Sequence, residues 1–347
     1  MSIKNDTFLR ACRREPTDYT PIWIMRQAGR YLPEYRALRE KYSFIQLCKA
    51  PAAAVEITLQ PLQRFALDAA IIFADILLPL EGMGVEFGFD QNDGPVIGSP
   101  LRRPADVDRI RVIEAEEATP YLFAAIRQAR AALADKVPLL GFAGAPFTLA
   151  SYLIEGGHSR NYERTKAMLY TEPKAWAKLM EKLVVILRGY LRAQVAAGAQ
   201  AVQLFDSWVG CLSPRDYAEF VAPYLRELIA GLTDLPAPVI HFATDVTSLL
   251  PLMKDSGAQV YGVDWRIELD QAWQIIGSDR AIQGNLDPAV LSAPPAVIEE
   301  RVQEILRRAG HRPGHIFNLG HGILPDAPIE NVQFLVETVH RLSRRTA

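Results

Sequence analysis

The sequence predicts an α/β protein, and in particular a single (β/α)₈ barrel. Eight short apolar stretches occur along the chain, helical stretches lie between several of them, and no linker or repeat divides the 347 residues. Near-continuous apolar strands favour a parallel sheet that is covered on both faces, and repeated strand–helix alternation favours a barrel. Barrels of this size commonly form one domain, so we expect one domain over residues 1–347. A doubly wound open sheet is the main alternative.

The predicted strands are all short, and most are followed by a polar or glycine-containing turn. In chain order they are Pro21–Met25, Ala69–Phe73, Pro138–Phe142, Ala201–Phe205, Val239–Phe242, Val260–Val263, Ala281–Gln283 and His315–Leu319. In a barrel, the residues that follow the strands gather at one face and build the active site there.

Helices are expected at Pro173–Ala196, Pro214–Leu232 and Pro294–Arg308, each of which opens with a proline suited to a first helical turn. A small β-hairpin is expected as an insertion after the second strand. Its strands would be Val85–Phe89 and Pro95–Gly98, joined by a turn at Asn92-Asp93-Gly94.

Charge and cysteine content limit the possible partners and compartment. The formal net charge is −2, which gives no overall attraction to nucleic acid or to an anionic membrane. The cysteines are Cys12, Cys48 and Cys211, an odd number with no CxxC pair, which indicates a reducing compartment. The stretch Met1–Thr20 lacks the apolar core of a signal peptide, and the apolar run Phe65–Leu80 is shorter than the ~20 residues of a membrane span. We therefore expect a cytoplasmic protein.

Metal and nucleotide motifs are missing from the sequence. No CxxC or HExxH pattern occurs, so no metal site is expected. The pair Gly82-Met83-Gly84 lacks the third glycine of a dinucleotide-binding loop.

Arginines are concentrated just after the first predicted strand, at Arg26, Arg30, Arg36 and Arg39. A guanidinium group presents a planar fork of donors that binds carboxylates in bidentate fashion. Such a run often forms surface salt bridges only. For Arg26 and Arg30 we favour carboxylate binding, because they follow a buried strand and Gly29 permits a tight turn between them.

Asp75, Tyr152, Ser207 and His321 are further candidates, each with a simpler structural alternative. Asp75 interrupts an apolar stretch, and an unpaired buried carboxylate requires partners or a function, although it could cap a turn at Ile76–Leu78. His321 lies between two glycines, which leaves its imidazole open to a ligand, although lone histidines are often structural. Tyr152 could be a core residue of a helix, and Ser207 could cap the turn after its strand.

Two motifs resemble those of the uroporphyrinogen decarboxylase family. The stretch PIWIMRQAGRYLPEYR, Pro21–Arg36, is similar to the family's N-terminal signature, and Gly141–Thr148 with Tyr152 and Glu155-Gly156 is similar to its second. The motifs FADIL, FDSWVG and NLGHG agree in kind and order. The resemblance implies a cofactor-free homodimer that converts uroporphyrinogen III to coproporphyrinogen III and four CO₂ in haem biosynthesis.

The resemblance also implies the substrate-binding residues. These are Arg26, Gln27, Ala28, Gly29, Arg30, Arg39, Asp75, Tyr152, Ser207 and His321. Among them, Asp75, Arg26 and Arg30 are the candidates for catalysis, with Asp75 accepting hydrogen bonds from pyrrole N–H groups. The proton donor stays open between His321 and Arg26, because histidine matches neutral pH better whereas the arginine lies in the pocket.

Two other functions compete with this interpretation. A zinc-dependent methyltransferase shares the expected fold, but His241-Phe242-Ala243 has alanine where a His-x-Cys ligand pair is needed. A non-catalytic tetrapyrrole carrier would use the same arginines, and the presence of Asp75 and His321 argues against it.

Overall fold

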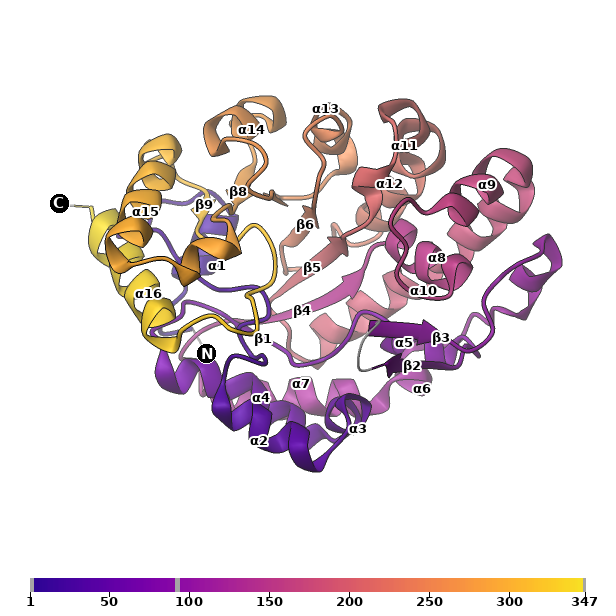
Figure 1. Cartoon of the computed structure of the whole chain (residues 1–347), viewed down its shortest axis with the longest axis horizontal. Helices are drawn as coiled ribbons and strands as arrows, with labels where there is room; N and C mark the ends of the chain where they lie inside the picture. The colour runs from indigo at the N-terminus through magenta and orange to yellow at the C-terminus, as the bar shows by residue number, and fades with distance from the viewer. Residues whose placement is uncertain (1–2, 91–93, 346–347) are drawn as a thin grey trace.

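The computed structural model describes residues 3–90 and 94–345, and its centre is a curled, parallel, seven-stranded sheet (Figure 1). The sheet order follows the chain: β1 (Ala70–Ile71), β4 (Leu139–Gly144), β5 (Ala201–Asp206), β6 (Val239–Ala243), β7 (Val260–Gly262), β8 (Ala281–Gln283) and β9 (His315–Ile316). Each neighbouring pair is parallel. The predicted α/β class and seven of the predicted strands are therefore confirmed.

The first predicted strand is wrong as a strand. Pro21–Met25 forms only an isolated parallel bridge, between Ile22 and Phe317. The Phe317 N–H donates to the Pro21 carbonyl (2.8 Å), and on the other side the Asp68 N–H donates to the Ile22 carbonyl (2.9 Å). The Ile22 N–H donates to the Asp68 carboxylate (2.8 Å) instead of to a neighbouring strand, which interrupts the ladder. The segment nevertheless lies between β9 and the residues just before β1.

The curl of the sheet brings together side chains from strands that are not neighbours. Gln283 of β8 donates from Nε2 to Oε1 of Gln203 on β5 (3.0 Å), although two strands separate them in the sheet. Trp23 Nε1 donates to Gln283 Oε1 (2.9 Å), and all three side chains are fully buried. This chain of hydrogen bonds crosses the inside of the curl and satisfies polar groups that would otherwise be costly to bury.

Helices follow one another around the outer face of the sheet, from α7 through α10, α12, α14 and α15 to α16 (Figure 1). The helices are α1 (Thr7–Cys12), α2 (Pro33–Lys41), α3 (Phe44–Lys49), α4 (Pro51–Arg64), α5 (Leu78–Gly82), α6 (Ala115–Ala118), α7 (Pro120–Leu133), α8 (Pro146–Glu155), α9 (Glu163–Thr171), α10 (Pro173–Ala197), α11 (Pro214–Phe220), α12 (Ala222–Ala230), α13 (Leu250–Met253), α14 (Leu269–Ile276), α15 (Pro295–Ala309) and α16 (Ile329–Ser343). In the described part of the chain, none is long and apolar enough to cross a bilayer.

Two of the three predicted helices are confirmed, and the third is wrong as a single helix. Helices α10 and α15 match the expected helices to within one residue at each end. The single helix expected at Pro214–Leu232 is two helices, α11 and α12, that meet at Val221. Pro223 lies in the first turn of α12, and a proline cannot supply the N–H that would continue a helix from α11.

The predicted hairpin is present after α5, as β2 (Phe87–Asp90) paired antiparallel with β3 (Gly94–Ile97). Asn92 and Asp93 of the predicted turn lie outside the described residues. The Ile97 N–H donates to the carbonyl of Gly156 at the end of α8 (2.8 Å). Phe89 packs edge to face on Phe44, with ring centroids 4.8 Å apart. The hairpin therefore joins α3 to α8, two helices that flank the candidate site.

Candidate active site

The chain turns sharply at Arg26, directly after the extended segment Pro21–Met25. Arg26 has φ of 61°, a left-handed conformation that residues other than glycine adopt rarely and at a cost. A Cβ on Gly29 would lie 2.8 Å from the Arg26 carbonyl oxygen, so any larger residue at position 29 would collide with the turn. The strained backbone of Arg26 thus places its exposed side chain at the carboxyl end of this segment.

The side chain of Arg26 lies against Gly322, next to His321. A Cβ built on Gly322 would lie 2.5 Å from Arg26 Cδ and 2.9 Å from Nε. His321 is half-buried, and burial together with the charge of Arg26 lowers its pKa below the usual 6.5. Its imidazole is therefore neutral near pH 7 and presents one N–H donor and one acceptor.

Asp75 follows β1 and is half-buried, since protein atoms surround it while part of the side chain remains accessible. Its Oδ1 accepts a hydrogen bond from the Leu77 N–H (2.8 Å), which is the turn-capping role that was the simpler alternative. Burial raises the pKa of Asp75 to about 6, against the opposing effects of the Leu77 N–H and Arg26. Oδ2 makes no hydrogen bond within residues 3–90 and 94–345, where it is available as an acceptor.

Tyr152 lies on α8, as expected, and its surroundings connect it with Asp75 and Arg26. Burial and the negative charge of Asp75 raise the pKa of Tyr152 to about 12, while Arg26 acts in the opposite direction. The Tyr152 ring packs edge to face on Trp208, with centroids 5.9 Å apart. The charge of Arg26 thus acts on Asp75, Tyr152 and His321, which come from three different parts of the chain.

Ser207 is half-buried directly after β5 and next to Trp208. Its carbonyl accepts a hydrogen bond from the Thr244 hydroxyl (2.8 Å), which fixes the turn after the strand.

Arg30 and Arg39 lie on the α2 side of this group. Both are exposed, and the charges of both act on Tyr35, whose pKa is raised by burial. The Arg39 guanidinium donates to the Tyr42 carbonyl (2.8 Å) and lies 5.9 Å from the ring centroid of Phe44. The structure connects these two arginines with Tyr35 more directly than with Asp75.

Gln27, Ala28 and Gly29 make up the turn itself. The Gln27 side chain is fully buried, donates to the Ala69 carbonyl (3.1 Å) and accepts from the Ile24 N–H (3.1 Å). It therefore holds the turn against the residues before β1, while the Gln27 backbone N–H donates to the Ile24 carbonyl (2.8 Å) and its carbonyl accepts from the Tyr31 hydroxyl (2.8 Å). Ala28 and Gly29 are half-buried and small, which leaves space beside Arg26.

Two further residues near this site, Trp208 and Arg266, are not among those that the sequence predicts. Trp208 lies at the centre of an aromatic cluster with Tyr152, His158 and Tyr162. Arg266 follows β7 and lies close enough to His321 for its charge to contribute to the lowered pKa of that imidazole. The signal for Arg266 was available, because it is an arginine just after a strand, as Arg26 is.

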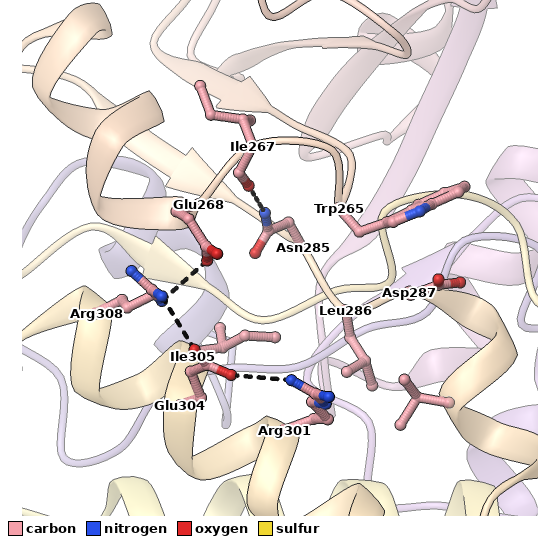
Figure 2. A pocket seen from close by; sticks show the side chains of 11 residues that line it. Trp265, Ile267, Glu268, Asn285, Leu286, Asp287, Arg301, Glu304, Ile305 and Arg308 are labelled. Atoms are coloured by element: carbon pink, nitrogen blue, oxygen red, sulfur yellow. Dashed lines mark hydrogen bonds and ion pairs between the residues drawn. The ribbon is translucent and has the colours of Figure 1, made fainter.

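A separate hollow of about 280 Å³ lies between the turn after β8 and helix α15 (Figure 2). Its arginines are already paired with acids: Arg308 with Glu268 and Glu304, and Arg301 with Glu304. None of the candidate residues lines it. The basic groups of this hollow are thus less available to an acidic ligand than those around Arg26.

A curled parallel sheet with arginines, a carboxyl group and an imidazole after its strands is typical of α/β enzymes, whose sites lie at the carboxyl ends of the strands. The chain belongs to the uroporphyrinogen decarboxylase family, since the model of that family (URO-D) matches residues 3–342. Enzymes of this family are carboxy-lyases, and the resemblance seen in the two sequence motifs is confirmed.

Individual proteins support the same assignment. A uroporphyrinogen decarboxylase of Carboxydothermus hydrogenoformans is 57% identical over 339 residues, covering 98% of this chain and 97% of that protein. One of Sorangium cellulosum is 56% identical over 340 residues, covering 98% and 97%. A solved methyltransferase from Methanosarcina mazei has a TM-score of 0.80 at 19% identity, covering 98% of this chain and 99% of that one, and thus shares the fold.

The alternative function, a zinc-dependent methyltransferase, requires a cluster of side chains that can bind the metal. Within residues 3–90 and 94–345, no three His, Cys, Asp or Glu side chains are grouped so that they could hold a metal ion. Family membership, not this finding, favours the decarboxylase over the methyltransferase.

Proposed function

We propose that the chain decarboxylates the four acetate arms of uroporphyrinogen III, giving coproporphyrinogen III and four CO₂ in haem biosynthesis. The reaction would take place at the group formed by Arg26, Asp75, Tyr152 and His321. One contact carries the assignment of the site: the Arg26 side chain packs against Gly322 beside His321, and its charge also acts on Asp75 and Tyr152 from separate segments.

The chemistry needs a positive charge on the ring before CO₂ can leave. Direct loss of CO₂ from an acetate arm would leave an unstabilised carbanion. A proton added to the neighbouring pyrrole carbon makes the ring cationic, and the electron pair of the breaking C–C bond then flows into it. CO₂ departs, an exocyclic methylene forms, a second proton converts it to methyl, and loss of the first proton restores the pyrrole. Each arm therefore consumes one proton overall.

Asp75 is suited to stabilise this cation. Its Oδ2 would accept hydrogen bonds from pyrrole N–H groups, and its negative charge would lower the energy of the protonated ring. With a pKa of about 6, most of the carboxyl group is ionised near pH 7. Partial burial strengthens its interaction with a cation, because fewer water molecules screen it.

The carboxylate arms would be held by basic and hydroxyl groups at this site and on its α2 side. Arg26, Arg30 and Arg39 supply guanidinium forks, and Ala28 and Gly29 with the Gln27 backbone shape the turn beside them. Tyr152, Ser207 and His321 would add hydrogen bonds. The lowered pKa of His321 favours a neutral imidazole that donates its N–H to an arm over one that acts as an acid.

We also propose that residues 1–347 form one (β/α)₈ domain. In this domain Pro21–Met25 would occupy the position of the eighth barrel strand, and the β2–β3 hairpin would be an insertion.

We propose that the protein is a cytoplasmic homodimer that binds no nucleic acid or membrane. The formal net charge of −2 supports the absence of a nucleic acid partner. Light scattering after size-exclusion chromatography tests the dimer, and an elution mass of one chain would contradict it.

The function is tested by mixing the purified protein with uroporphyrinogen III under reducing conditions and separating the products by chromatography. We expect porphyrinogens with progressively fewer carboxylates, ending in coproporphyrinogen. Binding without any loss of carboxylate would instead support a tetrapyrrole carrier. Arg26→Lys keeps the charge but loses the fork, so unchanged decarboxylation kinetics in that variant would exclude a bidentate role for Arg26.

A further inference from the structure

Arg266 follows Trp265 in the loop that packs against Gly320, the residue before His321, and the sequence motifs do not mark this loop. His321 stands between Gly320 and Gly322, and each glycine is covered by a different arginine-bearing segment. A Cβ on Gly320 would lie 2.7 Å from Trp265 N and 3.0 Å from Asp264 Cα, whereas one on Gly322 would meet Arg26. The loop after β7 is therefore pressed against the backbone next to the candidate imidazole.

This loop is held from two directions. Asn285, which follows β8, donates from Nδ2 to the carbonyls of Asp264 (3.0 Å) and Ile267 (2.7 Å). Figure 2 shows Asn285 bonded to Ile267, with Trp265 on the same loop. Asp264 is 2% exposed and accepts from the Arg266 N–H (3.0 Å) and the Asp245 N–H (2.6 Å). These bonds keep the loop in one conformation before any ligand arrives.

The guanidinium of Arg266 is anchored on one side and open on the other. Its Nη1 donates to Asp264 Oδ2 (2.6 Å), and its Cζ lies 4.5 Å from the ring centroid of Trp265. Nε lies 3.6 Å from Asp245, which is 68% exposed and therefore a weakly held partner. The side chain of Arg266 is 43% exposed, and Nη2 makes no hydrogen bond within residues 3–90 and 94–345. An anchored guanidinium with a free edge binds an incoming carboxylate with little loss of side-chain entropy.

We infer that Arg266 binds a peripheral carboxylate of the tetrapyrrole beside His321, and so contributes to recognition of the polyacidic substrate. This inference rests on the proposed function, since it assigns a residue to the same site. Charge-assisted hydrogen bonds to a carboxylate are stronger than neutral ones, but solvent screening at this exposure reduces the effect.

The test compares Arg266→Gln with Arg280→Gln. Arg280 is a matched control, because it is 40% exposed and pairs with Asp279, yet it precedes β8 at the end away from the site. We expect KM for uroporphyrinogen to rise about 10-fold in R266Q, with kcat within about twofold of wild type, and neither constant to change in R280Q. Because one cation is lost, KM of R266Q should also depend less steeply on ionic strength.

The outcomes separate this inference from the proposed function. If the wild type turns over uroporphyrinogen and R266Q keeps its KM and its salt dependence, the inference is wrong. If the wild type does not turn over, the proposed function fails, and titration with oxidised uroporphyrin still tests Arg266: weaker binding by R266Q than by R280Q supports it, and equal binding overturns it. Should R266Q fold poorly, R266M, which also removes the charge, is measured instead, and an unchanged KM there would count against the inference.

Discussion

The side chain of Arg26 lies directly over Gly322, so that a Cβ at position 322 would come within 2.5 Å of Arg26 Cδ. This contact joins two segments from opposite ends of the chain and sets the arginine beside His321. Gly322 is not among the residues with positive φ, so glycine is needed there for the space it leaves and not for its backbone conformation. The position of Arg26 thus depends on a residue that contributes no functional group.

Gly322→Ala should therefore displace Arg26 and impair catalysis without greatly affecting the fold. The collision involves the middle of an exposed side chain, which can swing away into solvent. We expect kcat/KM for uroporphyrinogen to fall about 10-fold or more, since misplaced positioning groups commonly cost that much. The free energy of unfolding should change by less than about 1 kcal/mol. Steady-state kinetics and urea denaturation measure the two effects.

Gly189→Ala is the matched control for that variant. Gly189 lies within α10, and a Cβ there would meet nothing within 4 Å. Alanine in a helix interior should stabilise the protein by about 0.5–1 kcal/mol and leave the kinetics unchanged. Equal kinetics for G322A and G189A would show that the Arg26–Gly322 contact has no catalytic importance.

Asp75→Asn tests the electrostatic role of the carboxylate. The amide keeps the size of the side chain and an oxygen for the Leu77 N–H, but it carries no charge to stabilise a cationic ring. We expect kcat to fall by about 10²–10³, the usual cost of removing one preorganised electrostatic group. Product chromatography during single turnovers measures the step directly. Near-normal turnover in a folded D75N protein would remove Asp75 from the mechanism.

The pH dependence of kcat/KM should show the ionisation of the same group. Asp75 has a pKa of about 6, and the proposed mechanism needs its anion, so activity should decrease as the pH falls through about 6. The lowered pKa of His321 adds no comparable change above pH 6.5. The residual activity of D75N should lack the acid limb. An identical limb in both proteins would assign it to another group or to the substrate.

Some of this site could be read from the sequence because its causes are local. Arg26 follows an apolar segment and precedes a glycine, and Asp75 interrupts an apolar run, so both were recognisable as polar groups at strand ends. For Asp75, the turn-capping interpretation is confirmed by the Leu77 N–H, while a functional role for the carboxylate stays a prediction. The helices that begin with proline were also placed well, except where Pro223 divides one of them.

Other features depend on contacts between distant residues and could not be predicted. Pro21–Met25 has a strand-like sequence, but Asp68 takes the Ile22 N–H that a strand ladder would use. The Gln27 side chain is engaged by the Ala69 carbonyl, which no local pattern indicates. For Arg266, the place after a strand was visible in the sequence, but the packing of its loop against Gly320 was not.

The Asp75 carboxyl should also reduce the stability of the protein near neutral pH, which D75N would relieve. A carboxyl whose pKa is raised in the folded state, here from 3.8 to about 6, favours folding fully only below its unfolded pKa, and this contribution is lost as the pH rises through about 6. Partial exposure reduces the effect to about 1–2 kcal/mol. We expect D75N to be more stable than wild type in urea at pH 7.5, with the difference decreasing towards pH 5. A less stable D75N at pH 7.5 would contradict this.

Asp68 should matter for stability more than any group of the candidate site, because it holds the segment that leads to Arg26. It is 1% exposed and accepts from Asn5 Nδ2 (2.8 Å), Tyr19 OH (2.7 Å) and Ile22 N (2.8 Å), and it lies 2.8 Å from His340 Nε2. Asp68→Asn removes the charge and points an amide N–H₂ at donors, so we expect a loss of about 2–4 kcal/mol in the free energy of unfolding. Asp279→Asn, at an exposed ion pair, should cost less than about 0.5 kcal/mol. If urea denaturation gives equal losses for the two variants, Asp68 does not anchor this segment.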